Sequence, residues 1–195
     1  GSEVWEADPL VFEPGRSYVI EAPSGKGKTS LLSMIYGLRD DYRGVIRLNS
    51  RDISQIGRKE WSELRKRSLS YIFQGLELFS DLTALENIEL KNSITRQMTP
   101  QRIRELSLRL GFADHLNRKA GILSFGQQQR VAILRALCQP FDFLLADECF
   151  SHIDTENSLA AYQVIREECE LREAGLILTS LNGQHFVDQA VRLRL

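Results

Sequence analysis

Residues 22–30 carry the residue types and the spacing that bind phosphate. They follow the strand-like residues 17–20 and precede the apolar helical residues 31–35, and a phosphate-binding loop needs this order of strand, loop and helix. Glycines let backbone N–H groups point at phosphate oxygens, while Lys28 can reach the outer phosphates and the hydroxyl of Thr29 can bind a metal ion. The expected phosphate-contacting residues are Ala22, Pro23, Ser24, Gly25, Lys26, Gly27, Lys28, Thr29 and Ser30.

The first position of this pattern is Ala22, where the usual residue is glycine. Alanine avoids a positive φ, so the loop forms only if the backbone at Ala22 is not left-handed. An ordinary turn rich in glycine, serine and lysine is the alternative interpretation.

Two acidic residues follow a second strand-like run. Residues 143–146 are continuously apolar, which is typical of a strand covered on both faces in a parallel sheet, and Asp147 and Glu148 come directly after them. Carboxylates at the end of such a strand can bind a cation or polarise a water molecule. On their own, the two acids are equally consistent with the cap of a following helix.

The composition describes a globular chain. Its 195 residues suffice for one domain with a full core, and 25 lysines and arginines nearly balance 26 aspartates and glutamates. This balance argues against a nucleic-acid surface. Cys138, Cys149 and Cys169 are widely spaced and odd in number, which favours reduced thiols over disulfides or a zinc site. No run approaches the roughly 18 apolar residues of a membrane span.

Alternating strand and helix patterns must position these residues. We expect strands at residues 17–20, 45–48, 69–73, 143–146, 175–179 and 190–195, and an edge strand at residues 4–12. We expect helices after the phosphate loop and at residues 58–66, 85–90, 100–110, 124–138 and 158–172. This alternation predicts an α/β fold with an open, mostly parallel sheet that binds ligands at the carboxyl ends of its strands.

Residues 75–138 form a helical sub-domain in this prediction, because the strand signal disappears after residue 74. Thr99 and Pro100 fit the start of one helix, and Ser124 and Gln127 are spaced as a capping box at the start of another. The rest of the single domain, its core, comprises residues 1–74 and 139–195.

Five patterns now follow one another in a fixed order. They are the phosphate loop, Gln74 after a strand, the sequence LSFGQQQR at residues 123–130, the acidic pair, and Ser151-His152-Ile153-Asp154. Over nearly the whole chain this order resembles the nucleotide-binding domain of ATP-binding-cassette (ABC) proteins, whose leucine-serine-glycine-glycine-glutamine signature other phosphate-loop ATPases lack. The resemblance implies a P-loop NTPase core with a small antiparallel β part near the N-terminus and an inserted α-helical sub-domain. Within the family, the chain looks most like ATPase subunits for lipoprotein release, macrolide export or cell division.

The resemblance implies a site for ATP and Mg²⁺. The metal ligands would be Thr29, Gln74 and Asp147. Catalytic roles would fall to Lys28, Gln74, Ser180 and to Glu148 as general base. In the family two domains face head to tail, and each signature closes over the ATP of the other domain. The signature residues in contact with that ATP would be Ser124, Phe125, Gly126 and Gln127.

Some positions depart from the family pattern. Phe125 replaces the first signature glycine, whereas Gly126 keeps the second. Ser180 stands where the family places a histidine against the γ-phosphate, so we expect slow hydrolysis. His185 lies five residues further on and is either its substitute or a surface residue. Trp5 is the strongest candidate for stacking on adenine, and core packing is an equal alternative.

The function that the resemblance implies is that of an ATPase subunit of an ABC transport system. It would bind MgATP, form a homodimer or paired cassette, hydrolyse the nucleotide and drive an integral membrane subunit from the cytoplasmic face of the membrane, with no nucleic acid as partner. Two alternatives stay open: a soluble ABC ATPase without a transport role, and a degenerate cassette that uses ATP binding as a switch. Ala22, Phe125 and Ser180 motivate the second alternative, and Glu148 argues against it.

The segment from Gln74 to Leu85 is where we expect the membrane subunit to dock, as it does beside this glutamine in the family. Apolar residues follow Gln74 in a polar setting, which is more apolar surface than a connection needs. The alternative is that these side chains anchor the helical sub-domain to the core. They are Leu76, Leu78, Phe79 and Leu82.

Overall fold

The computed structural model describes residues 2–6, 9–181 and 187–195, and its centre is a parallel sheet of five strands. The strands lie in the order β4-β5-β6-β1-β7, and every neighbouring pair is parallel. A separate antiparallel ribbon joins β2 (Arg47–Leu48) to β3 (Arg51–Asp52). The predicted α/β class is confirmed. The bounds of the five strands are β1 Ser17–Glu21, β4 Leu69–Ile72, β5 Phe143–Asp147, β6 Gly175–Ser180 and β7 Val191–Arg194.

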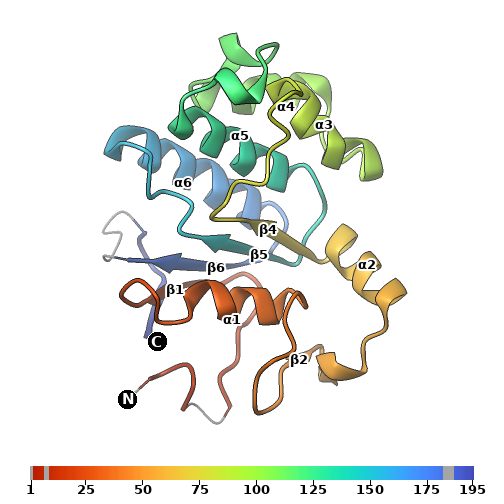
Figure 1. The fold of residues 1–195 in the computed structure, drawn as a ribbon, viewed down its shortest axis with the longest axis vertical. Coiled ribbons are helices and arrows are strands. Elements are labelled where there is room, and N and C mark those ends of the chain that lie inside the picture. The colour runs from red at the N-terminus through yellow and green to blue at the C-terminus, as the bar shows by residue number, and fades with distance from the viewer. Residues whose placement is uncertain (1, 7–8, 182–186) are drawn as a thin grey trace.

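The helices pack in layers on both faces of this sheet (Figure 1). α1 covers one face, α5 and α6 cover the other, and α3 and α4 lie on the far side of α5. No helix among the described residues is both long and apolar enough to cross a bilayer. The bounds are α1 Lys28–Ile35, α2 Arg58–Arg67, α3 Ala84–Thr95, α4 Pro100–Arg109, α5 Phe125–Leu137 and α6 Thr155–Glu170, with short 3₁₀ helices at Ile53–Gln55, Ala113–His115 and Ala120–Ile122.

The helix starts follow the predicted capping chemistry. Thr99 accepts a hydrogen bond from the N–H of Arg102 ahead of Pro100. Ser124 and Gln127 bond each other's backbone N–H groups, so the predicted capping box of α5 is confirmed. These motifs satisfy N–H groups that have no partner inside the helix.

The predicted edge strand at residues 4–12 is wrong, since the structure assigns no strand to residues 4–6 or 9–12. β7 occupies the position beside β1, so the edge that this segment would have extended is already paired. Pro9 also lacks the N–H that a ladder requires. The segment instead contributes apolar side chains to the core, with Val4 buried and Leu10 and Phe12 packed against it.

One hydrophobic cluster connects the helical part to the sheet. It contains Ile88 and Leu106 from α3 and α4, Leu134 from α5, and Leu144 and Leu176 from the sheet. The division into a core and a sub-domain at residues 75–138 therefore stays a prediction, because α5 packs both on α3 and on β4.

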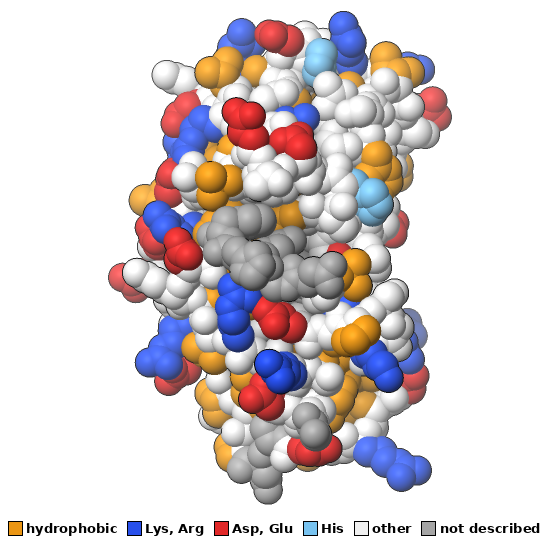
Figure 2. All heavy atoms as spheres, turned by 90° about the vertical axis from the view of Figure 1, so that its left-hand side faces the viewer, with side chains coloured by type: hydrophobic (Ala, Val, Ile, Leu, Met, Phe, Trp, Pro, Cys, Tyr) orange, Lys and Arg blue, Asp and Glu red, His pale blue; other side chains and the backbone are white. Residues whose placement is uncertain are grey.

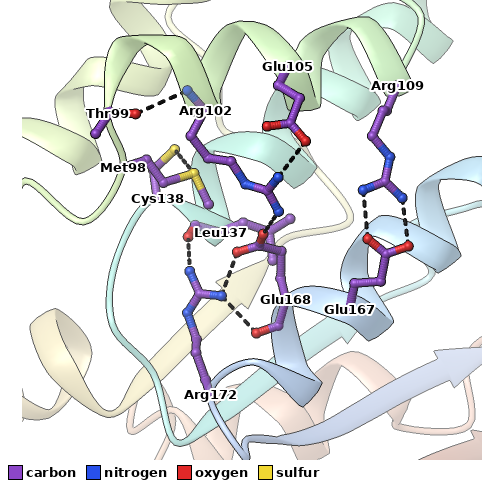
Figure 3. A network of polar contacts seen from close by, with 10 residues as sticks. All are labelled: Met98, Thr99, Arg102, Glu105, Arg109, Leu137, Cys138, Glu167, Glu168 and Arg172. Atoms are coloured by element: carbon purple, nitrogen blue, oxygen red, sulfur yellow. Dashed lines mark hydrogen bonds and ion pairs between the residues drawn. The ribbon is translucent and has the colours of Figure 1, made fainter.

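A network of ion pairs fastens α4 to α6 (Figure 3). The carboxylate of Glu168, whose side chain is 4% exposed, lies 2.6 Å from Arg102 and 2.5 Å from Arg172. Its neighbour Glu167 forms two hydrogen bonds of 2.6 and 2.7 Å to Arg109 at a half-exposed position. Both carboxylates pair with arginine, but Glu168 is buried and has two such partners, whereas Glu167 is half-exposed and has one.

This difference predicts unequal costs of removing each carboxylate. Glu168→Leu should lower the free energy of unfolding by roughly 3–5 kcal/mol, because two arginines lose a buried partner. The matched control Glu167→Leu should cost about 1 kcal/mol or less, because water screens an exposed pair. Urea unfolding followed by circular dichroism measures both. Equal losses would show that the buried pair does not dominate this contact.

Candidate functional site

Four of the predicted site segments meet at one edge of the sheet. The phosphate loop follows β1, Gln74 lies two residues after β4, Asp147 ends β5 and Ser180 ends β6. Because all these strands are parallel, their carboxyl ends lie at the same edge. Figure 2 faces this edge, where acidic, basic and apolar side chains are interspersed and no single charge prevails.

The phosphate loop folds around Lys28. Gly25 and Gly27 have φ values of 76° and 98°, which only glycine adopts freely, whereas Ala22 is not left-handed and so meets the condition for this loop. Lys28 is 3% exposed, and its ammonium donates to the carbonyls of Ala22 at 2.6 Å and Pro23 at 3.0 Å. No side chain caps the start of α1, so its first N–H groups are free to bind an anion.

A chain of polar contacts links three elements at this edge. Lys28 Nζ lies 3.1 Å from Glu148 Oε1. Gln74 Nε2 donates to Glu148 Oε2 at 3.2 Å, and Thr29 Oγ1 approaches Gln74 Oε1 at 3.5 Å. Glu148 has a φ of 47°, an uncommon conformation for a residue with a side chain. The sheet thus brings together Lys28, Thr29, Gln74 and Glu148, which lie far apart in the sequence.

Asp147 provides an oxygen without a hydrogen-bond partner beside these polar contacts. Its Oδ1 accepts a hydrogen bond of 2.7 Å from Thr179, whose hydroxyl also accepts from the N–H of Glu148. Its Oδ2 is buried and has no hydrogen-bond partner, which is costly unless a cation binds there. Burial and the Asp147 carboxylate raise the pKa of Tyr71. Oxygens of Thr29, Gln74 and Asp147 are the donors that a hard divalent cation takes. Among the described residues, no three His, Cys, Asp or Glu side chains cluster as a metal site.

The signature segment lies apart from the phosphate loop. α5 begins on the opposite face of the sheet from α1, so one copy of the chain does not bring Ser124, Gly126 and Gln127 to its own loop (Figure 1). A Cβ on Gly126 would come within 3.1 Å of the carbonyl of His152, so a glycine suits this position. Phe125 is 46% exposed, and its ring meets that of His152 edge-on at a centroid distance of 4.5 Å.

The remaining candidates from the sequence are Ser180, His185 and Trp5. Ser180 is 2% exposed, and its carbonyl accepts a 3.4 Å hydrogen bond from the N–H of Ala22, so the position touches the phosphate loop. His185 lies outside the described residues. Trp5 is 49% exposed and lies 3.8 Å from the Cβ position of Gly27. Core packing therefore does not explain Trp5.

The segment after Gln74 is partly buried, so only part of its expected apolar surface is exposed. Leu76 is 4% exposed, Leu78 packs against the core and Leu82 is half-buried, as the anchoring alternative requires. Phe79 alone of the four is 60% exposed.

Two polar residues that sequence reasoning missed hold this segment. Arg135 donates to the carbonyls of Leu76 and Glu77 at 2.6 and 2.5 Å. Asn87 is fully buried, and its amide bonds both the N–H and the carbonyl of Phe79. Polar residues inside apolar helical stretches were the only sequence signal for either role.

Thr179 and Gln129 were also missed. Thr179 orients Asp147, and Gln129 donates to the carbonyl of Glu148 at 3.3 Å. Each contact joins segments 19 or more residues apart, so no local pattern reveals it.

Comparison with known proteins agrees with this geometry. A family model described as "ABC transporter" matches residues 8–151. An uncharacterized ABC transporter ATP-binding protein of Thermotoga maritima is 34% identical and covers 94% of this chain, which spans 80% of that protein. The lipoprotein-releasing system ATP-binding protein LolD 2 of Caulobacter vibrioides is 31% identical, with coverages of 93% and 82%. The macrolide export ATP-binding/permease protein MacB of a Shewanella species is 32% identical, and this chain covers 29% of its length.

A solved structure has the same arrangement. The ATP-binding cassette MJ0796, in a dimeric post-hydrolysis state bound to ADP and Pi, superposes with a TM-score of 0.77 at 28% sequence identity. The superposition covers 89% of this chain and 78% of that one.

The buried position of Lys28 predicts that ATP binding depends on it. Lys28→Ala should abolish tight ATP binding, because it removes the ammonium that meets the outer phosphates inside the loop. Lys26→Ala is the matched control: Lys26 is exposed in the same loop, and alanine keeps its backbone N–H. Calorimetric titration with ATP measures both. Near-native affinity of the Lys28 variant would refute the site.

Proposed function

Because this chain belongs to the ABC transporter family, we propose that it is the ATP-hydrolysing subunit of a transport system and that a membrane subunit does the transport. The relatives named for lipoprotein release and for macrolide export support this proposal. The observation that carries it is the contact chain from Lys28 through Glu148 and Gln74 to Thr29, because it joins a phosphate loop to a carboxylate base.

In the proposed site, Mg²⁺ binds with ATP. The oxygens of Thr29, Gln74 and Asp147 fit this ion, and the unpartnered Oδ2 of Asp147 is the strongest support. When bound, the ion neutralises charge on the phosphates during their transfer.

Glu148 is the proposed general base. Its Oε1 lies 3.1 Å from the Lys28 ammonium, so the carboxylate already has a cationic partner. The outer phosphates compete for the Lys28 ammonium, and this competition frees Glu148 to accept a proton from water. Gln74 donates a hydrogen bond to Oε2, the other carboxylate oxygen, and this bond fixes the orientation of the Glu148 side chain.

The proposed working form is a head-to-tail homodimer. The distance in the fold between α5 and the phosphate loop supports it, since Ser124, Phe125, Gly126 and Gln127 need a second copy to reach a nucleotide. The dimeric relative bound to ADP and Pi supports the same arrangement. In this form the half-exposed Trp5 beside Gly27 offers a face for adenine.

A degenerate cassette is the second candidate, and Ser180 is the observation that favours it. A serine at the end of β6 has no imidazole to place against the γ-phosphate, so hydrolysis is slow in this proposal. Glu148 and its contacts support hydrolysis all the same.

Replacing the base tests the proposed function. Glu148→Gln should keep MgATP affinity and stop hydrolysis, so that an ATP-bound dimer accumulates. The amide preserves shape, and Lys28 loses a competing anion. Light scattering in saturating MgATP, together with phosphate release, measures both effects, and Glu156→Gln in the first turn of α6 is the control. A monomer that still hydrolyses ATP would contradict the proposal.

The proposed docking site for the membrane subunit is the segment after Gln74, at the inner face of the membrane. Phe79 supports this site because its large apolar side chain is exposed. The amide of Asn87 bonds both the backbone N–H and the carbonyl of Phe79 and so fixes its position. In this proposal a movement of Phe79 also moves Gln74, which lies five residues earlier in the chain.

Charge at Phe79 should uncouple the two proteins. Phe79→Asp should leave the melting temperature and basal ATPase rate unchanged, and it should abolish stimulation by the membrane subunit, because a desolvated carboxylate opposes docking. Leu78→Asp is the contrasting variant: its side chain packs on the core, so it should lower the melting temperature. Normal stimulation of the Phe79 variant would place docking elsewhere.

A further inference from the structure

The start of α5 and the turn after β5 lie against each other. The ring of His152 meets that of Phe125 edge-on at a centroid distance of 4.5 Å, and the carbonyl of His152 lies 3.1 Å from the Cβ position of Gly126. In the proposed head-to-tail dimer, residues 124–127 meet the nucleotide of a second copy. The same dimer therefore brings His152 beside that nucleotide.

The imidazole of His152 has one ring nitrogen to spare. The side chain is exposed, and its Nδ1 lies 2.8 Å from the hydroxyl oxygen of Ser151. No hydrogen bond joins Nε2 to any of the described residues. When the serine hydroxyl donates to Nδ1, the ring proton lies on Nε2, and a charged imidazole carries a proton there as well. Nε2 can therefore donate a hydrogen bond to an anion outside its own chain.

The other basic residue beside the signature, Arg130, is already engaged. It donates to the carbonyls of Gly126 and Leu110 at 3.2 and 2.8 Å, and to the amide oxygen of Asn157 at 2.6 Å. These bonds hold its guanidinium at a half-buried position within its own chain. The N–H of His152 is thus the basic group that this surface can offer to a phosphate.

The proposed nucleotide site needs such a donor. Phosphoryl transfer spreads negative charge over the outer oxygens of the γ-phosphate, and positive groups or hydrogen-bond donors must stabilise it. Lys28 lies 3.1 Å from the Glu148 carboxylate and shares its charge with that anion. Within the described part of the chain, the end of β6 offers the hydroxyl of Ser180 and no imidazole.

A short turn connects His152 to the proposed base of its own chain. The N–H of Ser151 donates to the carbonyl of Glu148 at 3.1 Å, and the amide of Gln129 donates to the same carbonyl at 3.3 Å. The turn holds Glu148 beside the phosphate loop of its own chain and His152 beside the start of α5. One turn therefore serves both nucleotides of the proposed dimer.

We propose that His152 of each copy donates a hydrogen bond from Nε2 to a γ-phosphate oxygen of the ATP that the other copy holds. The inference rests on the proposed function and adds a catalytic residue to its site. In the reaction, a water oxygen forms a bond to the γ-phosphorus. The bond from that phosphorus to the bridging oxygen breaks, and its electron pair leaves with ADP. Glu148 accepts the proton of water, and His152 stabilises the charge on the phosphate without transferring a proton.

His152→Phe tests the ring nitrogen alone. Phenylalanine keeps an aromatic ring against Phe125, so the melting temperature should not change. The affinity of the single chain for ATP should also stay the same, because His152 serves the other copy. Phosphate release in the first turnover should slow about ten- to a hundredfold, the effect of one lost hydrogen bond to a charged group. An unchanged rate would overturn the proposal.

The matched control is His115→Phe. His115 is half-buried in the 3₁₀ helix Ala113–His115, which packs against α4. The same substitution there should leave the first-turnover rate unchanged. An equal loss of rate in both variants would show that the effect of His152→Phe is not specific to the proposed contact and would overturn it.

Mixed dimers show which copy provides the histidine. His152→Phe and Glu148→Gln chains should each be slow alone, because one lacks the donor and the other lacks the base. They are mixed before ATP is added, with the Glu148→Gln chain in excess, and co-purification through a tag on one chain shows that they have paired. In a mixed dimer, the ATP on the His152→Phe chain meets its own Glu148 and the His152 of the other copy.

The first-turnover rate per His152→Phe chain should then return to near that of the unmodified chain. Paired chains without this recovery would show that the histidine acts within its own chain, which would overturn the proposal. His185 gives a further outcome: if His185→Ala stops hydrolysis and His152→Phe does not, the imidazole belongs to His185.

Hydrolysis by the unmodified chain separates this inference from the proposed function. If that chain hydrolyses ATP and the His152 variant is equally fast, the inference fails and the proposed function stands. If the unmodified chain neither binds nor hydrolyses ATP, the proposed function itself fails.

Discussion

A buried lysine at the carboxyl edge of a parallel sheet requires negative partners, and the site is built around that requirement. Lys28 is 3% exposed, and an ammonium at such a position is stable only with compensating dipoles and charge. The carbonyls of Ala22 and Pro23 and the carboxylate of Glu148 provide them. The loop therefore folds so that these two carbonyls face Lys28. The strand β5 ends at a position from which Glu148 can reach the Lys28 ammonium. In the proposed mechanism, a bound phosphate takes the place of Glu148 as the anion beside Lys28.

The features that local chemistry determines could be predicted from the sequence. The phosphate loop, the buried strand before Asp147 and the capping box of Ser124 and Gln127 each depend on residues a few positions apart. The exposure of the leucines after Gln74 could not, because it depends on how α3 and α5 pack around them. The same limit explains the wrong edge strand at residues 4–12, since β7 takes the place beside β1 only in the folded chain.

The backbone after Gln74 is held against its own preference. Leu76 and Glu77 both have positive φ, at 62° and 51°, and each such non-glycine residue costs of order 1–3 kcal/mol. Arg135 binds the carbonyls of both residues, and its side chain is itself half-buried. Arg135 on α5 holds this strained turn, and Asn87 on α3 holds the backbone of Phe79 directly after it, so a small displacement of either helix alters the segment. A segment held by two helices suits a link between the proposed docking surface and Gln74.

In the proposed head-to-tail dimer, residues 124–127 meet the nucleotide of a second copy, and they are exposed or partly exposed in the single chain. Phe125 is 46% exposed at the start of α5, and its only ring contact among the described residues is the exposed His152. A large apolar side chain at such a position loses contact with water when a second surface covers it, and a glycine would gain nothing there. A side chain on the neighbouring Gly126 would be tight, because the carbonyl of His152 lies 3.1 Å from its Cβ position. In the proposed head-to-tail dimer, Phe125 adds apolar area at the contact between the two copies, and the second copy must leave room for its ring.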